Sequence, residues 1–182
     1  MIAYLAGSFV RVIVNMSDAQ TILNPDAVAL YRATLGAFAT GVAIITVADG
    51  DHAVGLTVNS FTSVSLDPPL VLWCLGDKSD RGVFFRPAKH FVVNILSTEQ
   101  QALANRCAKR GNYRFEREEL DLSHPGAPAL PGCIARLWCD AHEQVVLGDH
   151  IAMVGRVTTF DSRPGDGLTY FRGRYGLAVS AE

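Results

Sequence analysis

Short hydroxyl and amide side chains recur at alternate positions in this chain, as Thr57, Asn59, Ser63 and Ser65. Because successive side chains of a β-strand point to opposite faces, the segment Gly55–Pro69 is predicted to be one strand with a polar face and an apolar face. A row of short, neutral hydrogen-bonding groups suits a flat ligand with polar edges better than a charged one. The apolar face is formed by Leu56, Val58, Val64 and Leu66.

This chemistry matches a flavin, whose isoalloxazine ring has donors and acceptors along one edge and whose ribityl phosphate needs several donors. The loop of residues 76–81 supplies Lys78, Ser79 and Arg81 for the phosphate, helped by amides at the start of the next helix. The strand at residues 91–94 supplies an edge and one amide for the ring. Periodicity alone favours a simpler interpretation over a flavin site, namely that the polar row is the solvated face of an edge strand.

The elements that position these residues alternate between short apolar strands and turn signals. Asn24 is a helix cap with Pro25 at the first helical position, and Gly41 is predicted to end that helix. Asp49-Gly50 and Gly148-Asp149 are typical of tight turns. Ser97 and Gln100 form a capping box for a helix that runs to about Lys109. Strands are expected over residues 42–47, 70–75, 91–96, 133–141, 143–147, 150–160 and 168–171.

About seven short strands with hairpin turns and few helices predict a mainly β protein, a closed antiparallel β-barrel with flanking helices. The strands do not alternate strictly with helices, which disfavours a parallel, doubly wound sheet. Neither a G-x-G-x-x-G nor a G-x-x-x-x-G-K-[ST] motif is present, so the sequence does not support a Rossmann or P-loop nucleotide site.

Composition limits the class of protein further. The chain has 182 residues, of which 49% are hydrophobic and 19% are charged, as expected for one globular domain. Its formal net charge of −2 argues against a nucleic-acid partner, which needs a basic surface. The four cysteines form no C-x-x-C pair, so we predict no metal site and no disulfide framework, and we expect a cytoplasmic protein.

The first residues differ from the rest of the chain. Residues 1–15 are apolar but too short and too interrupted to span a membrane, and they lack the basic start of a signal peptide. We expect residues 1–20 to be an N-terminal extension, either flexible or the product of an upstream start, and residues 21–182 to form the domain. An extra strand within residues 1–15 is the alternative.

Several ordered blocks of this chain resemble the flavin reductase-like family. The first is the run Phe38-Ala39-Thr40-Gly41-Val42-Ala43-Ile44-Ile45-Thr46, and the second is the whole segment from Gly55 to Leu70. Three further blocks follow in order, Phe91–Leu96, Gly148–His150 and Tyr170–Tyr175. Together they cover roughly residues 25–175, and ordered blocks at natural spacing are far more specific than any single motif.

The resemblance implies an FMN-binding split β-barrel of antiparallel Greek-key type that forms homodimers with flavin sites near the dimer interface. It implies hydride transfer from NADH or NADPH to FMN or FAD and release of reduced flavin to a partner flavin-dependent monooxygenase. Carried over by residue, Thr57 to Ser60 contact the ribityl chain and phosphate, and Ser63 to Ser65 contact the ring. The phosphate loop and the strand beside the ring complete the implied site. The implied cofactor-binding residues are Thr57, Val58, Asn59, Ser60, Ser63, Val64, Ser65, Lys78, Ser79, Arg81, Phe91, Val92, Asn94 and Tyr175.

His150 is the histidine at a family-matching position, and it is the predicted catalytic residue. Imidazole donates or accepts a proton near neutrality, so His150 can meet the nicotinamide or the flavin edge. The plain alternative is a strand-end histidine that pairs with Asp149 or with backbone. Tyr175 likewise either covers the flavin or packs in a C-terminal hairpin. The acidic residues Asp77 and Asp80 depart from the serine-rich loop typical of the family.

The sequence is also compatible with two other functions. A non-catalytic flavin-binding or carrier protein would bind flavin without reduction by pyridine nucleotides. A related split-barrel flavin oxidase, acting on a small amine or on pyridoxamine phosphate, would need a basic pocket for a substrate phosphate. The near-neutral sequence has no obvious pocket of that kind.

Overall fold

A computed structural model describes residues 25–179 of the protein. It divides into two units, Met1–Phe38 and Ala39–Glu182. The described part of the first unit, residues 25–38, contains helix α1 (Pro25–Leu35), with Asp26 in its first turn and Arg32 in its last. The predicted helix end at Gly41 is wrong, because α1 ends before Gly36, whose amide donates to the Arg32 carbonyl at 2.9 Å. The expected Asn24 cap and the extension over residues 1–20 lie outside the described residues.

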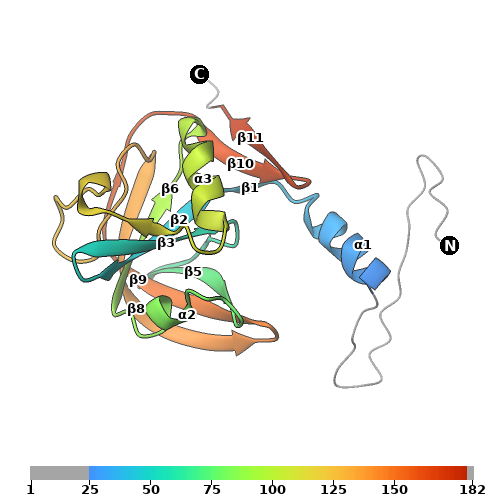
Figure 1. Ribbon diagram of the computed structural model, residues 1–182, viewed down its shortest axis with the longest axis horizontal. Coiled ribbons are helices and arrows are strands. Elements are labelled where there is room, and N and C mark those ends of the chain that lie inside the picture. The colour runs from blue at the N-terminus through green and yellow to red at the C-terminus, as the bar shows by residue number, and fades with distance from the viewer. Residues whose placement is uncertain (1–24, 180–182) are drawn as a thin grey trace. The chain divides into compact units, whose positions relative to one another are not determined.

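The second unit is built from antiparallel strands, drawn in Figure 1. One sheet has eight strands in the order β4-β5-β9-β8-β6-β2-β3-β7, and a smaller sheet has the order β1-β10-β11. The mainly β class is confirmed. The large sheet contains β2 (Ala43–Asp49), β3 (His52–Val58), β4 (Thr62–Leu66), β5 (Pro69–Gly76), β6 (His90–Ile95), β7 (Arg114–Phe115), β8 (Ala135–Leu147) and β9 (His150–Ser162). The small sheet contains β1 (Thr40–Gly41), β10 (Gly167–Phe171) and β11 (Arg174–Ala178), and the helices are α2 (Gly82–Phe85), η1 (Thr98–Gln100), α3 (Gln101–Ala108) and η2 (Arg117–Glu119).

The predicted single strand over Gly55–Pro69 is wrong. The chain forms β3 up to Val58, leaves the sheet, and returns as β4 from Thr62. These strands lie far apart in the sheet order, because β3 pairs with β2 and β7 while β4 pairs with β5. A register shift also occurs between Ser63 and Ser65 where β4 pairs with β5. The polar row is therefore divided between two places.

Most of the local turn chemistry agrees with the sequence. Gly50 and Gly148 adopt the left-handed conformation, with φ of 64° and 61°, in the turns that join β2 to β3 and β8 to β9. The capping box of Ser97 and Gln100 is present at the start of η1, and α3 follows it directly. The two strands expected over residues 133–147 are one strand, β8, with a register shift between Ala141 and Glu143.

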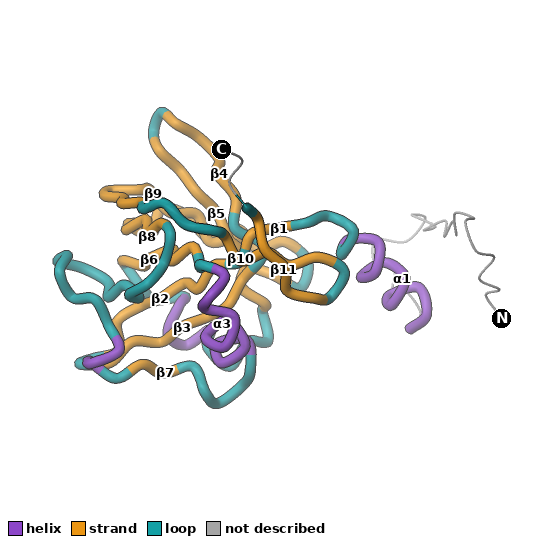
Figure 2. Tube along the Cα trace, turned by 90° about the horizontal axis from the view of Figure 1, so that it is seen from above, coloured by secondary structure: helices purple, strands orange, loops and turns teal. Residues whose placement is uncertain are grey.

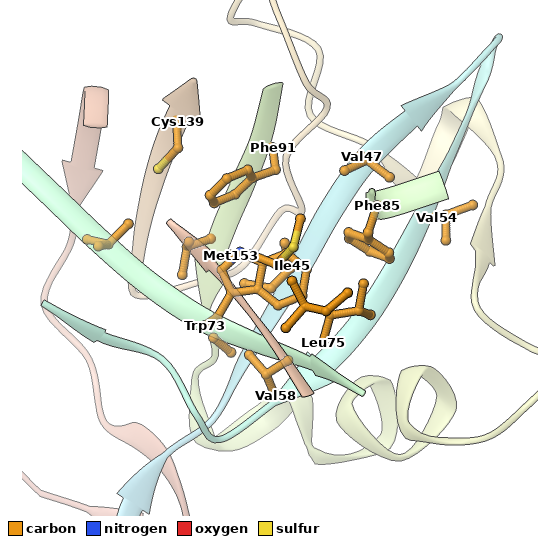
Figure 3. Close-up of a cluster of buried hydrophobic side chains, with 14 residues drawn as sticks. Ile45, Val47, Val54, Val58, Trp73, Leu75, Phe85, Phe91, Cys139 and Met153 are labelled. Carbon is orange, nitrogen blue, oxygen red and sulfur yellow. The ribbon is translucent and has the colours of Figure 1, made fainter. Parts of the chain in front are cut away.

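The main core lies on one face of the large sheet. Trp73 of β5 is fully buried and meets Phe85 and Phe91 edge-on, at ring-centroid distances of 5.3 and 5.9 Å (Figure 3). The same cluster includes Val54 from β3, near the opposite end of the sheet order, so the sheet curls around this core. Gly155 is required here, since a Cβ atom would lie 2.3 Å from Phe91 Cζ.

Helix α3 covers a second cluster on the other side of β2 and β3. Ala104 and Cys107 of α3 are fully buried there together with Ile44 and Phe115. Figure 2 shows α3 lying beside β3, near the β10–β11 hairpin. Within residues 25–179, no helix is long and apolar enough to cross a membrane. All four cysteines are free thiols.

Candidate functional site

A cavity of about 160 Å³ lies where the end of β3, the end of α3 and the β10–β11 hairpin meet. Its lining residues combine three small apolar side chains, two tyrosines, one threonine and one asparagine. Four of the predicted cofactor-binding residues come together in it, and three others were missed by the sequence reasoning. The predicted residues are Thr57, Val58, Asn59 and Tyr175, and the missed ones are Val42, Ala108 and Tyr170.

The tyrosine wall is a cross-strand pair. Tyr170 of β10 and Tyr175 of β11 are register partners, and their ring centroids lie 5.3 Å apart at an interplanar angle of 67°. Burial, and then the neighbouring Tyr170, raise the pKa of Tyr175 above its ordinary value. The hairpin turn contains Arg172 and Gly173 at φ of 47° and 78°. Tyr170 was detectable in principle, because a two-residue turn at Arg172-Gly173 places it opposite Tyr175.

The β3 side of the cavity is partly committed to holding the fold. The Thr57 Oγ1 atom donates a hydrogen bond to the Ala104 carbonyl of α3 at 2.7 Å. Val58 is buried, whereas Asn59 follows the end of β3 and is exposed. Of the polar residues at this edge, Asn59 therefore presents its amide most openly to a ligand.

The remaining members of the polar row lie with β4 and β5. The Ser60 hydroxyl accepts a hydrogen bond from the Cys74 amide at 3.0 Å, which fixes the chain between β3 and β4 to β5. Ser63 and Val64 are exposed and Ser65 is half-buried. None of these residues lines the cavity, so the structure separates the predicted ring contacts from the predicted ribityl contacts.

His150 lies at the start of β9, next to the predicted phosphate loop. It pairs with Gly76, and the Asp77 amide donates to the Asp149 carbonyl at 2.9 Å. Lys78 is exposed, and the Ser79 hydroxyl accepts from the Arg81 amide at 3.3 Å. The structure thus brings His150 to the phosphate loop, and His150 is not among the residues that line the cavity.

Arg81 departs from the predicted phosphate contact. Only 3% of it is exposed, and its guanidinium donates to the Cys107 carbonyl at 2.6 Å and to the Lys109 carbonyl. Its charge also lies over the Tyr113 ring, 4.6 Å from the centroid. Burial lowers the pKa of Arg81, and the nearby Asp80 carboxylate opposes that shift. Two of its nitrogen atoms are thus already bonded to backbone carbonyls, and Arg81 does not line the cavity.

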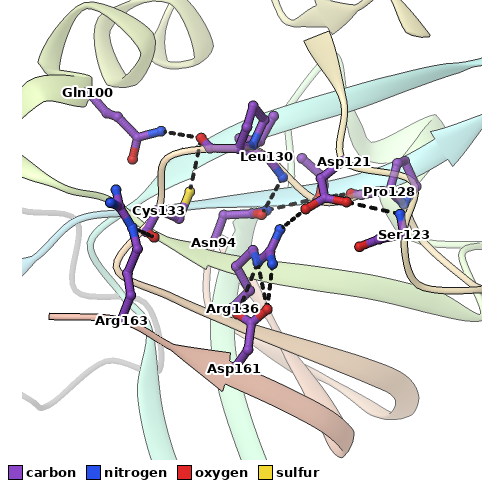
Figure 4. A network of polar contacts seen from close by, with 12 residues as sticks. Asn94, Gln100, Asp121, Ser123, Pro128, Leu130, Cys133, Arg136, Asp161 and Arg163 are labelled. Atoms are coloured by element: carbon purple, nitrogen blue, oxygen red, sulfur yellow. Dashed lines mark hydrogen bonds and ion pairs between the residues drawn. The ribbon is translucent and has the colours of Figure 1, made fainter. Parts of the chain in front are cut away.

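The strand predicted to lie beside the flavin ring is also interior. Phe91, Val92 and Asn94 are 3%, 0% and 0% exposed. The Asn94 Nδ2 atom donates to the Ile44 carbonyl at 2.9 Å. The Asn94 Oδ1 atom accepts from the Leu130 amide at 2.8 Å (Figure 4). In this structure each of the three side chains packs or bonds within the protein, and none of them lines the cavity.

The segment of the chain that forms this cavity matches a known protein family. Residues 35–177 match the family described as "Flavin reductase like domain", a range that includes every residue lining the cavity. The chain belongs to the flavin reductase-like family. It is 40% identical over 146 residues to "FMN reductase (NADH) SmoA" of Agrobacterium fabrum, covering 80% of this chain and 83% of that protein.

Two further relatives agree. The chain is 34% identical over 160 residues to the reductase component of a 4-nitrophenol 4-monooxygenase/4-nitrocatechol 2-monooxygenase of Rhodococcus opacus, covering 88% of this chain and 86% of that protein. The solved structure of the NADH:FAD oxidoreductase SgcE6 of Streptomyces globisporus, in complex with NAD and FAD fragments, superposes with a TM-score of 0.77 and 33% identity. That match covers 85% of this chain and 94% of that one.

The cavity fits part of a flavin by its own chemistry. Apolar and aromatic groups suit the faces of a planar ring, and the Thr57 and Asn59 polar groups suit a ribityl chain. Its volume is below the roughly 300–1,000 Å³ of typical small-molecule sites. This cavity by itself therefore does not enclose a whole flavin.

Proposed function

We propose that the protein is an NAD(P)H:flavin oxidoreductase that reduces FMN or FAD with NADH or NADPH and releases the reduced flavin to a partner monooxygenase. The observation that carries the proposal is the cavity at the end of β3, all of whose lining residues fall inside the flavin reductase-like match. Relatives named as NADH-dependent flavin reductases and as monooxygenase reductase components support the same activity.

The proposed division of labour follows the geometry. A bound flavin supplies the hydride chemistry itself, so the protein needs no nucleophile and acts by positioning. Asn59 and Thr57 would hold the ribityl chain, and the Tyr170–Tyr175 pair would cover one side of the site. His150, at the start of β9 beside the loop of residues 76–81, would meet the nicotinamide, and Lys78 and Ser79 of that loop would meet phosphate groups.

We also propose a homodimeric split β-barrel of Greek-key type in the cytoplasm. The curl of the large sheet around Trp73 supports barrel closure. A partner copy would complete the small cavity, and large exposed apolar side chains supply surface for it. Among these, Leu66 is 94% exposed, and Val146 and Phe160 are each 74% exposed.

Anaerobic reduction of added flavin tests the proposed activity. Purified protein is mixed with FMN or FAD and then with NADH or NADPH, and the loss of the oxidised flavin absorption band is followed. Rapid bleaching with one of these combinations is the expected result. Tight flavin binding without bleaching would identify a carrier protein instead, and neither binding nor bleaching would reject both.

A further inference from the structure

Arg81 is a buried arginine outside the lining of the proposed flavin pocket, and the family match gives it no role. We propose that Arg81 is a positioning residue: its guanidinium fixes the end of helix α3, and with it the Ala108 wall of the pocket, without touching the flavin phosphate. The inference rests on the proposed flavin reductase function and deepens it.

The Arg81 guanidinium is bonded to the C-terminal end of helix α3. The guanidinium bonds the carbonyls of Cys107 and Lys109, which flank Ala108 at the end of α3. The last carbonyls of a helix have no partner within the helix and carry its negative dipole end. A cation that bonds two of them at once therefore holds the terminal turn in place. Ala108, between the two acceptors, lines the flavin pocket.

Two side chains from different elements, Thr57 and Arg81, donate hydrogen bonds to α3. One turn before Cys107, the Ala104 carbonyl accepts the hydrogen bond of Thr57 Oγ1 at 2.7 Å. Thr57 reaches α3 from β3, and Arg81 reaches it from the start of α2. The two side chains thus clamp the same helix, and both bonds lie next to residues that line the pocket.

A further contact connects Arg81 to the rest of the site. Its guanidinium lies over the Tyr113 ring, and the Tyr113 carbonyl accepts from the Gly55 amide of β3 at 2.8 Å. Arg81 also ends the loop of residues 76–81, whose first residue pairs with His150. One buried side chain therefore ties together β3, the end of α3 and the loop beside His150.

Comparing FMN with riboflavin separates positioning from phosphate binding, because the two ligands differ only in the phosphate. The dissociation constants of both are measured by flavin fluorescence quenching for the wild type, Arg81→Met and Arg81→Lys. We expect Arg81→Met to weaken both ligands by the same factor, at least fivefold, and Arg81→Lys to recover part of that loss. If Arg81→Met does not fold, the same comparison is made with Arg81→Lys, which should weaken FMN and riboflavin by equal factors.

Arg136→Met is the matched control. Arg136 is also a largely buried arginine, with a side chain 18% exposed, but it pairs with Asp121 and Asp161 and lines no part of the flavin pocket. This variant should lose thermal stability and keep both affinities. A loss confined to FMN in the Arg81 variants would overturn the inference in favour of a direct phosphate contact, and unchanged affinities would overturn it as well. A wild type that binds neither flavin would instead reject the proposed function.

Discussion

The His150 Nδ1 atom lies 2.8 Å from the Asp149 Oδ1 atom at the turn between β8 and β9. The His150 side chain is 51% exposed. That exposure suits a group that meets a ligand arriving from solvent. The Asp149–His150 contact also fits a purely structural pair at the end of a strand. Measurements of activity distinguish the two roles.

His150→Ala distinguishes these roles. If His150 meets the nicotinamide, kcat/KM for the reducing nucleotide falls roughly tenfold, equivalent to about 1.4 kcal/mol of transition-state stabilisation. Flavin affinity stays unchanged, because His150 does not line the cavity. Steady-state kinetics and a flavin titration measure the two effects. His52→Ala, at an exposed histidine of β3 paired with Glu116, is the control. Parallel losses in kinetics and affinity would indicate a structural role.

Asn59 and Ser60 are neighbours with different expected roles. Asn59→Ala should weaken flavin binding roughly fivefold at constant thermal stability, since one hydrogen bond contributes about 1 kcal/mol. Ser60→Ala should lower both affinity and stability, because it removes the acceptor of the Cys74 amide. Fluorescence titration and thermal unfolding measure these effects. Thr62→Ala, on exposed β4, should change neither. An unchanged affinity in Asn59→Ala would exclude this edge as the flavin site.

Features fixed by residues close together in the chain were predicted correctly, whereas features fixed by contacts between distant strands were not. Turns at Gly50 and Gly148 and the capping box at Ser97 were predictable because short-range geometry fixes them. The break after Val58 was not, since both halves of the segment have good strand alternation and only pairing with β2 or β5 divides them.

The candidate site divides in the same way. Thr57, Asn59 and Tyr175 were predicted from the sequence and meet at one cavity. Arg81 and Asn94 were predicted as ligand contacts because each is a polar side chain in a segment implied to bind the flavin by the resemblance to the flavin reductase-like family. Their partners, the Cys107 and Ile44 carbonyls, are 26 and 50 residues away in the chain, so only the folded structure shows that these polar groups are already used.

Asn94→Ala tests whether this side chain stabilises the fold or contacts the cofactor. Asn94→Ala leaves the Ile44 carbonyl and the Leu130 amide buried without their partner, and each such group costs about 1–3 kcal/mol. We expect the free energy of unfolding to fall by about 3 kcal/mol, measured by urea denaturation, with flavin affinity of the folded protein preserved. Asn112→Ala, at an exposed position, should change stability by less than about 0.5 kcal/mol. A selective loss of flavin binding without destabilisation would restore Asn94 as a cofactor contact.

Asp121 gives the protein a defined acid sensitivity. Hydrogen bonds from Ser123, followed by the one from Arg136, lower the pKa of Asp121 from 3.8 to about 2 (Figure 4). Because the folded state holds this carboxyl ionised, the stabilisation is complete above the ordinary pKa and is lost as the pH falls from about 4 to about 2. Asp121→Asn should therefore be less stable than the wild type at pH 7 and should depend less on pH across that window.

Urea unfolding at a series of pH values measures this dependence. The exposed Asp51 supplies the matched control, and Asp51→Asn should follow the wild-type curve. Arg136 also pairs with Asp161, so Asp121→Asn leaves that second ion pair in place and removes only the Asp121 part of the acid response. An Asp121→Asn curve parallel to the wild type between about pH 4 and 2 would show that the carboxylate gains no stabilisation from Ser123 and Arg136.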